Sequence, residues 1–307
     1  MSSTASIHSL TSAHIAAVRG IASRPEFTAD FGAFLSSEEC RKALEQAASV
    51  VACDAAGEVI GFLLCSSQPM ADGTWQALLR PAVLPEWRRR GIGSAMLEEA
   101  TTRLRHGSEK TVLHALFGWQ PCEALTGFAE SQGFTCVRHF HHMERNAADL
   151  PELPWPEGIT ARSFDGSDGM FTAWNAAYNL GFASHFRFCP GTETECREIA
   201  AAAGFTAENV ILAFHGSEPV GFVRVAAGDQ NDDPGSGWVH LLCVAPAHRS
   251  RGLGRALLRE GMARLQALGC TCLHLTVDAA SPTAPQLYAA EGFHSTKVRR
   301  IWERVID

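Results

Sequence analysis

The sequence lacks the features of a secreted, membrane-spanning or metal-binding protein. None of its ten cysteines forms a Cys-x-x-Cys pair, and most lie in apolar or helical patterns, which favours reduced, buried thiols. The first thirty residues have no continuous apolar core of a signal peptide, and no run approaches the ~20 apolar residues of a membrane span. We therefore expect a cytoplasmic protein that holds no metal ion and does not bind a membrane.

A surplus of basic residues is also absent. Lys and Arg number 26 against 33 Asp and Glu, a formal net charge of −7. This charge argues against a nucleic-acid partner, because binding to a phosphate backbone needs a basic face. The length of 307 residues predicts about two domains, and 46% hydrophobic residues are enough for two buried cores.

Two arginine- and glycine-rich stretches share the pattern Arg-x-x-Gly-x-Gly. The first runs from Arg88 to Gly93 and the second from Arg249 to Gly254, 161 positions later (249 − 88). Each follows an apolar, strand-like run and precedes an amphipathic helix. Backbone N–H groups and the positive end of a helix therefore meet at one point. The pattern predicts a site for a small phosphate-bearing anion, used twice.

A proline-rich segment near residue 150 separates two halves of the chain. We place a first domain at 1–148, a linker at 149–157 and a second domain at 158–307. The helix after each turn repeats its apolar register with the same offset, in Ile92, Met96, Leu97 and Leu104 and in Leu253, Leu257, Leu258 and Leu265. This repeat supports a duplication.

The hydrophobic periodicity predicts the same order of elements in both halves. In the second half it indicates strands at 159–164, 209–214, 219–226, 237–244 and 272–277, and helices at 169–183, 193–203, 253–269 and 283–291. In the first half a strand at 111–117 and a helix at 122–132 match the end of that series. The order predicts a mixed α/β fold of two tandem domains, each with a mostly antiparallel sheet flanked by helices.

Two phosphate-binding motifs are excluded by the residues around the turns. A dinucleotide-binding turn needs a third glycine, which neither Ser94-Ala95-Met96 nor Arg255-Ala256-Leu257 supplies. A Walker loop needs Gly-Lys-Ser/Thr, which is absent from both turns.

The second half resembles the GNAT superfamily of acetyl-CoA-dependent N-acyltransferases. Val244-Ala245-Pro246, the turn from Arg249 to Gly254, and Leu287-Tyr288 followed by Gly292-Phe293 fit the signature of that family. The resemblance covers the second half fully and the first half in outline. It implies that the N–H groups of the turn hold the pyrophosphate of acetyl-CoA and that a splayed strand lines the pantetheine arm. The residues so assigned are Leu242, Cys243, Val244, Arg249, Ser250, Arg251, Gly252, Leu253, Gly254, Arg255 and Ser281, and in the first half Arg88, Arg89, Arg90, Gly91, Ile92, Gly93 and Ser94.

The resemblance implies that Tyr288 protonates the leaving thiolate. Tyr288 is one of only two tyrosines and stands four residues before Gly292, where the family has its acid. The alternative is a core tyrosine that packs a helix on the sheet. Ser281 stands where the family often has Asn, and it can cap the following helix as Asn does.

The strand before the turn contains a candidate base that could deprotonate the amine. Strand alternation places His240 on the same face as Trp238, Leu242 and Val244, and His240 is the first candidate. Asp278 is a weaker one, and a packed histidine with a water chain as the base is the alternative.

The first half departs from the family at two places. The position four residues before Gly133 holds Ala129, so the acid is missing, and Pro81 removes a backbone donor from the strand before the turn. We interpret this half as a degenerate domain that either still binds CoA or only supports its partner.

The acceptor is expected against the first two helices of the second half. His185 and Arg187 lie in an aromatic segment there, and Arg187 suits a carboxylate or phosphate of the acceptor. The alternative is a helix end that buries its aromatic residues. The histidines of the run from 139 to 142 are interpreted as surface or interface residues, because no carboxylate or Cys partner has ligand spacing.

Together these residues predict a cytoplasmic N-acetyltransferase, monomeric or homodimeric. It would move acetyl from acetyl-CoA directly to the amine of a small molecule, with the second half catalytic. Two alternatives remain: a CoA-binding sensor or scaffold without turnover, and an enzyme that acetylates protein lysines or N-termini.

Overall fold

The computed structural model describes most of the chain, and the statements below concern that part. The described residues are 5–27, 43–70, 73–104, 111–116, 123–148, 150, 154–202, 204–228 and 235–306. Among them, no helix has the length and apolarity needed to cross a bilayer.

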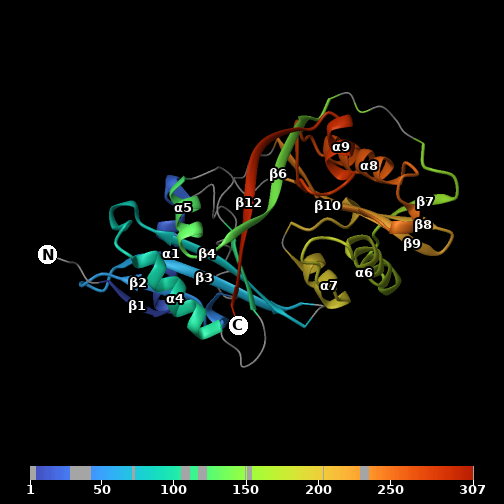
Figure 1. The fold of residues 1–307 in the computed structure, drawn as a ribbon. Coiled ribbons are helices and arrows are strands. Elements are labelled where there is room, and N and C mark those ends of the chain that lie inside the picture. The colour runs from blue at the N-terminus through green and yellow to red at the C-terminus, as the bar shows by residue number, and fades with distance from the viewer. Residues whose placement is uncertain are drawn as a thin grey trace. The chain divides into compact units, whose positions relative to one another are not determined.

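The chain forms two compact units, and two long strands each have one end in either unit. Unit 1 comprises Met1–Phe140 together with Lys297–Asp307, and unit 2 comprises His141–Thr296. Strand β6 (Thr135–Asn146) therefore begins in unit 1 and ends in unit 2, whereas β12 (His294–Ile306) begins in unit 2 and ends in unit 1 (Figure 1).

Unit 1 has the strand order β1-β2-β3-β4-β5-β12-β6, with helices packed on the sheet. All neighbouring pairs from β1 to β4 are antiparallel, whereas β4 and β5 run parallel. A single apolar core joins the sheet to helices α1 and α4, and it includes Trp302 and Ile306 from β12. Its elements are β1 (Ser6–Ser9), α1 (Ile15–Ala22), β2 (Val50–Cys53), β3 (Val59–Pro69), β4 (Trp75–Val83), α4 (Ile92–Leu104), β5 (Thr111–Leu116) and α5 (Glu123–Ser131).

Unit 2 repeats this plan with the strand order β6-β11-β10-β9-β8-β7. Helices α6 and α7 cover one face of the sheet, and α8 and α9 cover the other, so two apolar cores lie on opposite sides of the strands (Figure 1). The pair β10 and β11 is parallel, as in unit 1. The elements are β7 (Ile159–Ser163), α6 (Asp168–Phe182), α7 (Glu193–Ala201), β8 (Val210–His215), β9 (Glu218–Ala227), β10 (Ser236–Val244), α8 (Leu253–Ala267), β11 (Cys272–Asp278) and α9 (Ala284–Ala290).

The fold class expected from the sequence is confirmed, and the expected helices and strands of the second half agree with the structure to within two residues at each end. In the first half, the strand end expected at Phe117 and the helix start expected at Cys122 lie outside the described residues.

The end of β12 is expected to stabilise unit 1, although it is distant from the rest of that unit in sequence. Trp302 is 5% exposed within the core of unit 1, whereas Val305 on the same strand is 47% exposed and is not part of that core. We expect Trp302→Ala to lower the free energy of unfolding of unit 1 by about 3–5 kcal/mol, because it leaves a large cavity. Val305→Ala should change it by less than about 0.5 kcal/mol.

Hydrogen exchange measured by mass spectrometry would localise the effect. In Trp302→Ala, peptides from β2 and β3 should lose protection while peptides from β8 and β9 of unit 2 keep theirs. Equal protection of the unit 1 peptides in Trp302→Ala and Val305→Ala would contradict this assignment.

Candidate active site

Strand β10 contains one extra residue relative to its antiparallel partner β9. Val239 pairs with Val225 and Leu241 pairs with Arg224, so His240 is left between them as a β-bulge. A bulge changes the direction of a strand and shifts its side-chain alternation by one residue. Val239 and Val244 consequently pack in the same core, and the regular alternation expected along this strand is wrong at His240.

The parallel ladder between β10 and β11 ends at this bulge. The last paired residues are Val239 and Leu275, although β10 continues to Val244 and β11 to Asp278. On its other side β10 stays paired with β9 from Leu241 to Val244. The backbone groups of β10 that point toward β11 are thus available for an extended ligand beyond the bulge.

The turn after β10 has the backbone that its sequence pattern predicts. Ser250 and Gly252 both have positive φ, 60° and 85°, and Gly252 is the N-terminal cap of α8. Within the described part of the chain, the backbone N–H groups from Ser250 to Gly254 donate to no protein acceptor. Unpaired N–H groups at the start of a helix favour a phosphate, because they donate to it and the helix dipole attracts its charge.

Arg249 holds this turn against the sheet and helix α6. Its Nε donates to the carbonyl oxygen of Val244 at 3.0 Å, and its Nη2 donates to that of Gly181 at 2.8 Å. A Cβ at Gly181 would lie 2.4 Å from Sγ of Cys243, so only glycine permits this approach of α6 to β10. The side chain of Arg249 therefore holds the turn against β10 and α6.

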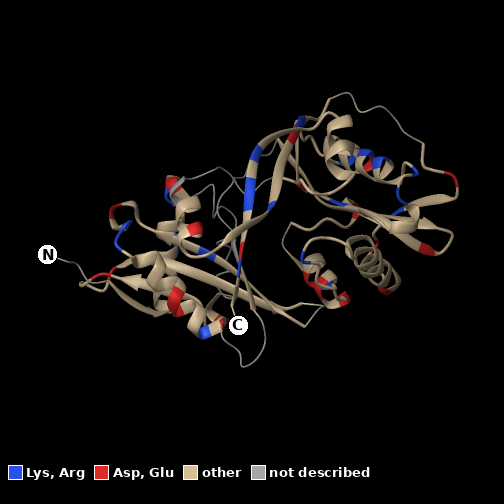
Figure 2. Ribbon diagram, viewed as in Figure 1, with Lys and Arg blue, Asp and Glu red and all other residues tan. Residues whose placement is uncertain are grey.

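A buried carboxylate neutralises the basic side chains near the start of α8. Glu291 accepts from Arg255 at 2.9 Å and from Arg259 at 2.7 Å, and its own side chain is 4% exposed. Lys and Arg positions are blue in Figure 2, and several blue segments lie on the helix labelled α8 in Figure 1. Arg251 is exposed and forms no ion pair with a carboxylate of the described residues, so it is the turn arginine best suited to meet an anion.

Tyr288 lies on α9 in the same apolar cluster as Leu242 and Val244. Burial, with a smaller contribution from nearby Cys243, raises the pKa of Tyr288 to about 12, so its hydroxyl stays protonated at neutral pH. Its ring packs edge-on against Phe293, with 6.1 Å between ring centroids. The hydroxyl has no hydrogen-bond partner among the described residues, and a ligand can therefore receive its proton.

Cys243 lies on the opposite face of β10, against α6. Its thiol donates to the carbonyl oxygen of Ala177 at 3.3 Å. Burial raises the pKa of Cys243 to about 12, and at neutral pH the group is a thiol rather than a thiolate. A neutral thiol is a poor nucleophile, which argues against a covalent acetyl intermediate on this residue.

His240 stands at the bulge beside Arg224 of β9. The ring keeps contact with solvent, yet the protein atoms around it and the charge of Arg224 together lower the pKa of His240 to about 4. The imidazole is therefore neutral at pH 7. Burial also lowers the pKa of Arg224, and its Nε atom is buried without a hydrogen-bond partner in the described structure.

Arg224 was not singled out from the sequence, although a signal was present. It interrupts the apolar strand from Val220 to Val225, which is otherwise buried. A charge inside such a strand is costly to bury and therefore points to a specific role. Here its positive field acts at the open end of the β10–β11 ladder.

Ser281 and Asp278 order the segment that leads into α9. Asp278 is buried and accepts from the N–H group of Ala280 at 2.9 Å. Ser281 accepts from the N–H group of Ala284 at 3.4 Å, but the N-cap position of α9 is held by Thr283, two residues after the residue expected there. Neither contact assigns proton transfer to Asp278.

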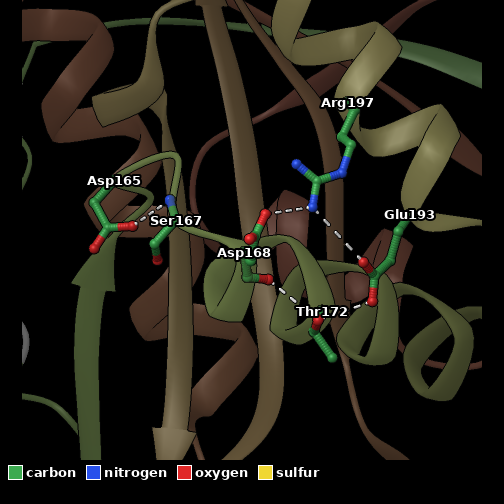
Figure 3. Close-up of polar contacts among 6 residues, drawn as sticks. All are labelled: Asp165, Ser167, Asp168, Thr172, Glu193 and Arg197. Atoms are coloured by element: carbon green, nitrogen blue, oxygen red, sulfur yellow. Dashed lines mark hydrogen bonds and ion pairs between the residues drawn. The ribbon is translucent and has the colours of Figure 1, made fainter.

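The helices expected at the acceptor are tied together by charges. Arg197 of α7 donates to Asp168 at the start of α6 at 2.7 Å and lies 4.0 Å from Glu193, while Thr172 donates to Glu193 at 2.8 Å (Figure 3). Because these contacts are exposed to solvent, they add little to the stability of the fold. They hold α7 beside the start of α6.

His185 and Arg187 lie in the turn that follows α6. The His185 ring packs edge-on against Phe182 at 5.6 Å, and the Arg187 guanidinium lies 5.6 Å from the centroid of the Phe186 ring. Arg187 has a φ of 54°, a left-handed conformation that is uncommon for a residue other than glycine. Asn179 holds the far end of the turn through two hydrogen bonds with Gly191.

Unit 1 has the same turn without the tyrosine. Arg89 and Gly91 have φ values of 62° and 79°, and Arg88 donates to the carbonyl oxygen of Val83 at 2.9 Å, as Arg249 does to Val244. The N–H group of Phe134 donates to Ala129, just as Phe293 donates to Tyr288, both at 3.0 Å. Ala129 thus occupies the place of Tyr288.

Other features of unit 1 also differ from those of unit 2. The ladder between β3 and β4 keeps one register from Gly61 to Pro69 without a bulge. Arg90 stacks on Trp87, and a Cβ at Gly93 would lie 3.2 Å from the ring of Phe128. The geometry of the turn is thus conserved between the units, whereas the surrounding site is not.

An interrupted parallel ladder, an N–H-rich turn and a protonated tyrosine define an acyltransferase of the CoA-dependent class. Residues 173–293 match the Acetyltransferase (GNAT) family, and residues 45–136 match an Acetyltransferase (GNAT) domain. The chain belongs to the GNAT acetyltransferase family and is an N-acetyltransferase with two such domains in tandem. GNAT acetyltransferases use acetyl-CoA.

Curated relatives and solved structures match most of the chain. The chain is 30% identical over 245 residues to a mycothiol acetyltransferase of Streptomyces scabiei, covering 77% of this chain and 73% of the relative. It is 31% identical over 255 residues to that of Mycobacterium marinum, covering 78% and 77%. A solved tandem GNAT protein from the clavulanic acid biosynthesis pathway superposes with a TM-score of 0.71 at 17% identity, covering 98% of each chain.

Proposed function

We propose that unit 2 transfers acetyl from acetyl-CoA directly to the primary amine of a small molecule. The observation that carries this proposal is Tyr288, a buried and protonated hydroxyl beside the open end of β10, where unit 1 has Ala129. The names of the mycothiol acetyltransferases support a small-molecule acceptor.

The proposal assigns the cofactor contacts to β10 and the turn that follows it. The N–H groups from Ser250 to Gly254 would hold the pyrophosphate of acetyl-CoA, with Arg251 as the cationic side chain. The backbone groups of the segment Leu242, Cys243 and Val244 that point toward β11, beyond the end of the parallel ladder, would align the pantetheine arm. The turn from Arg88 to Ser94 in unit 1 offers the same donors for a second CoA.

The chemistry requires two proton transfers around one carbonyl carbon. The amine nitrogen attacks the thioester carbonyl, the carbon–sulfur bond breaks, and the departing CoA thiolate takes the proton of the Tyr288 hydroxyl. His240 is neutral at pH 7 and accepts the proton that the amine loses. The charge of Arg224 disfavours a nearby ammonium ion, and this helps the amine to react in its neutral form.

The acceptor is proposed to lie against α6 and the turn that follows it. His185 and Arg187 would contact it there, and the left-handed backbone of Arg187 is the kind of conformation that collects at binding sites. An acetyltransferase acting on proteins would need an open groove for a peptide at the same place.

A calorimetric titration with acetyl-CoA tests which unit binds the cofactor. We expect Gly252→Glu to abolish turnover and one binding event, because a carboxylate at this turn repels the pyrophosphate. The matched variant Gly91→Glu should leave turnover within about twofold of the original. Turnover that persists in Gly252→Glu and disappears in Gly91→Glu would place the reaction in the other unit.

Replacement of Tyr288 tests the acid. We expect Tyr288→Phe to lower kcat about 100-fold while KM for acetyl-CoA stays within about threefold, because only the transferable proton is lost. The other tyrosine, Tyr178, provides the control, and Tyr178→Phe should retain kcat within about threefold. Acetyl-CoA binding without turnover in the unmodified protein, across a panel of small amines and peptides, would favour a sensor instead.

The pH profile tests His240. With a pKa of about 4 the imidazole is in its basic form throughout pH 6–9, so the rise of kcat/KM in this range should follow the acceptor amine. His240→Gln should lower kcat/KM roughly tenfold or more without changing the shape of the profile. A decrease of less than about twofold at all pH values would remove His240 from proton transfer.

A further inference from the structure

Three side chains outside the reaction path meet on unit 2. His142 and Glu144 are two positions apart on β6, and His274 lies on the neighbouring strand β11. Nε2 of His142 and Nδ1 of His274 are 3.3 Å apart, and Oε2 of Glu144 is 3.9 Å from the same Nδ1. One ligand atom from each of the three residues lies within 4.8 Å of the others.

The register of the sheet explains why these side chains meet. His142 and Glu144 share one face of β6, because strand residues two positions apart point the same way. His274 pairs with Trp238 of β10, and the Trp238 ring lies 5.2 Å from each of the two imidazole rings. The indole therefore shields one side of the cluster and restricts the orientation of the histidines.

The separations suit the ligands of a single metal ion. Nitrogen and oxygen ligands about 2.0–2.1 Å from a tetrahedral zinc ion are about 3.3 Å from one another. The two imidazole nitrogens already have this separation. Oε2 of Glu144 is 3.9 Å from Nδ1 of His274, and all three ligand atoms lie within 4.8 Å of one another, so a rotation of the half-buried Glu144 side chain has to bring its oxygen closer to both nitrogens.

We propose that His142, Glu144 and His274 bind a divalent transition-metal ion of the zinc class. Two imidazoles and one carboxylate are a donor set typical of Zn²⁺, and a water molecule would complete the tetrahedron. The ion would join β6, which the first half of the chain contributes, to β11 of unit 2. This is a stabilising site beside the Trp238–His240 ring stack, and it takes no part in acetyl transfer.

The histidines expected to lie at a surface or interface are therefore reinterpreted at one position. His142 is 7% exposed, so it is not a surface residue. Glu144 of the same strand supplies the carboxylate. The second imidazole comes from His274, which lies 132 positions further along the chain. The expectation that the protein holds no metal is replaced by this proposal.

Calorimetry with Zn²⁺ on the full, untagged chain after chelator treatment tests the site. We expect one equivalent of Zn²⁺ to bind, and Glu144→Gln to weaken the binding at least about tenfold, because the amide removes the anionic ligand and keeps the shape. Zn²⁺ should also raise the melting temperature of the unmodified protein and should raise that of Glu144→Gln less.

His294 provides the matched control. Its Nε2 is 3.7 Å from the other oxygen of Glu144 and its side chain is 67% exposed, but it lies outside the three-residue group. His294→Ala should bind Zn²⁺ within about twofold of the original protein. The proposal is overturned if no saturable one-to-one binding occurs, or if Glu144→Gln and His274→Asn both bind Zn²⁺ as tightly as the unmodified chain. If His274→Asn does not fold, Glu144→Gln alone decides, since its side chain is partly exposed.

Discussion

The extra residue in β10 determines how the site is built. Antiparallel pairing with β9 requires that β10 keep its register, so the added residue at His240 turns the strand instead of lengthening the ladder. Pairing with β11 stops at the same point, and peptide groups that a continuous sheet would satisfy are left available for a ligand. Tyr288 shares an apolar cluster with Val244, and Gly254 of the turn lies close to the same valine, so both lie beside the part of β10 that has left β11.

The two units share the backbone of the glycine turn and of the helix end but differ in the side chains around them. The turns have matching positive φ values, and the helices that end at Gly133 and Gly292 close with the same hydrogen bonds. The side chain at the last turn of this helix differs, alanine in unit 1 and tyrosine in unit 2. Backbone geometry of the kind that binds phosphate depends on glycine and φ, so it can be the same in two units whose neighbouring side chains differ.

The sequence predicted the parts of the structure that depend on local patterns. The apolar periodicity around Leu253 and Leu257 located α8, and the glycines at positions 252 and 254 located the turn, because both signals lie within a few residues. It did not predict the bulge, since His240 continues an apparently regular alternation. It also missed the meeting of His142 with His274, which depends on β6 lying beside β11, a pairing between segments 132 positions apart.

The pairing of the C-terminal strand β12 with β5 of unit 1 affects the order in which the two units can fold during translation. Leu116 of β5 pairs with Ile301 of β12, which the ribosome adds 185 residues later (301 − 116). Until then β5 presents an unpaired edge, and the core of unit 1 lacks Trp302 and Ile306. Unit 2 needs only strands that are already synthesised when its own last element emerges. The half of the protein that is translated first is therefore the last to be complete, and a chaperone would find its exposed edge throughout the synthesis of the second half.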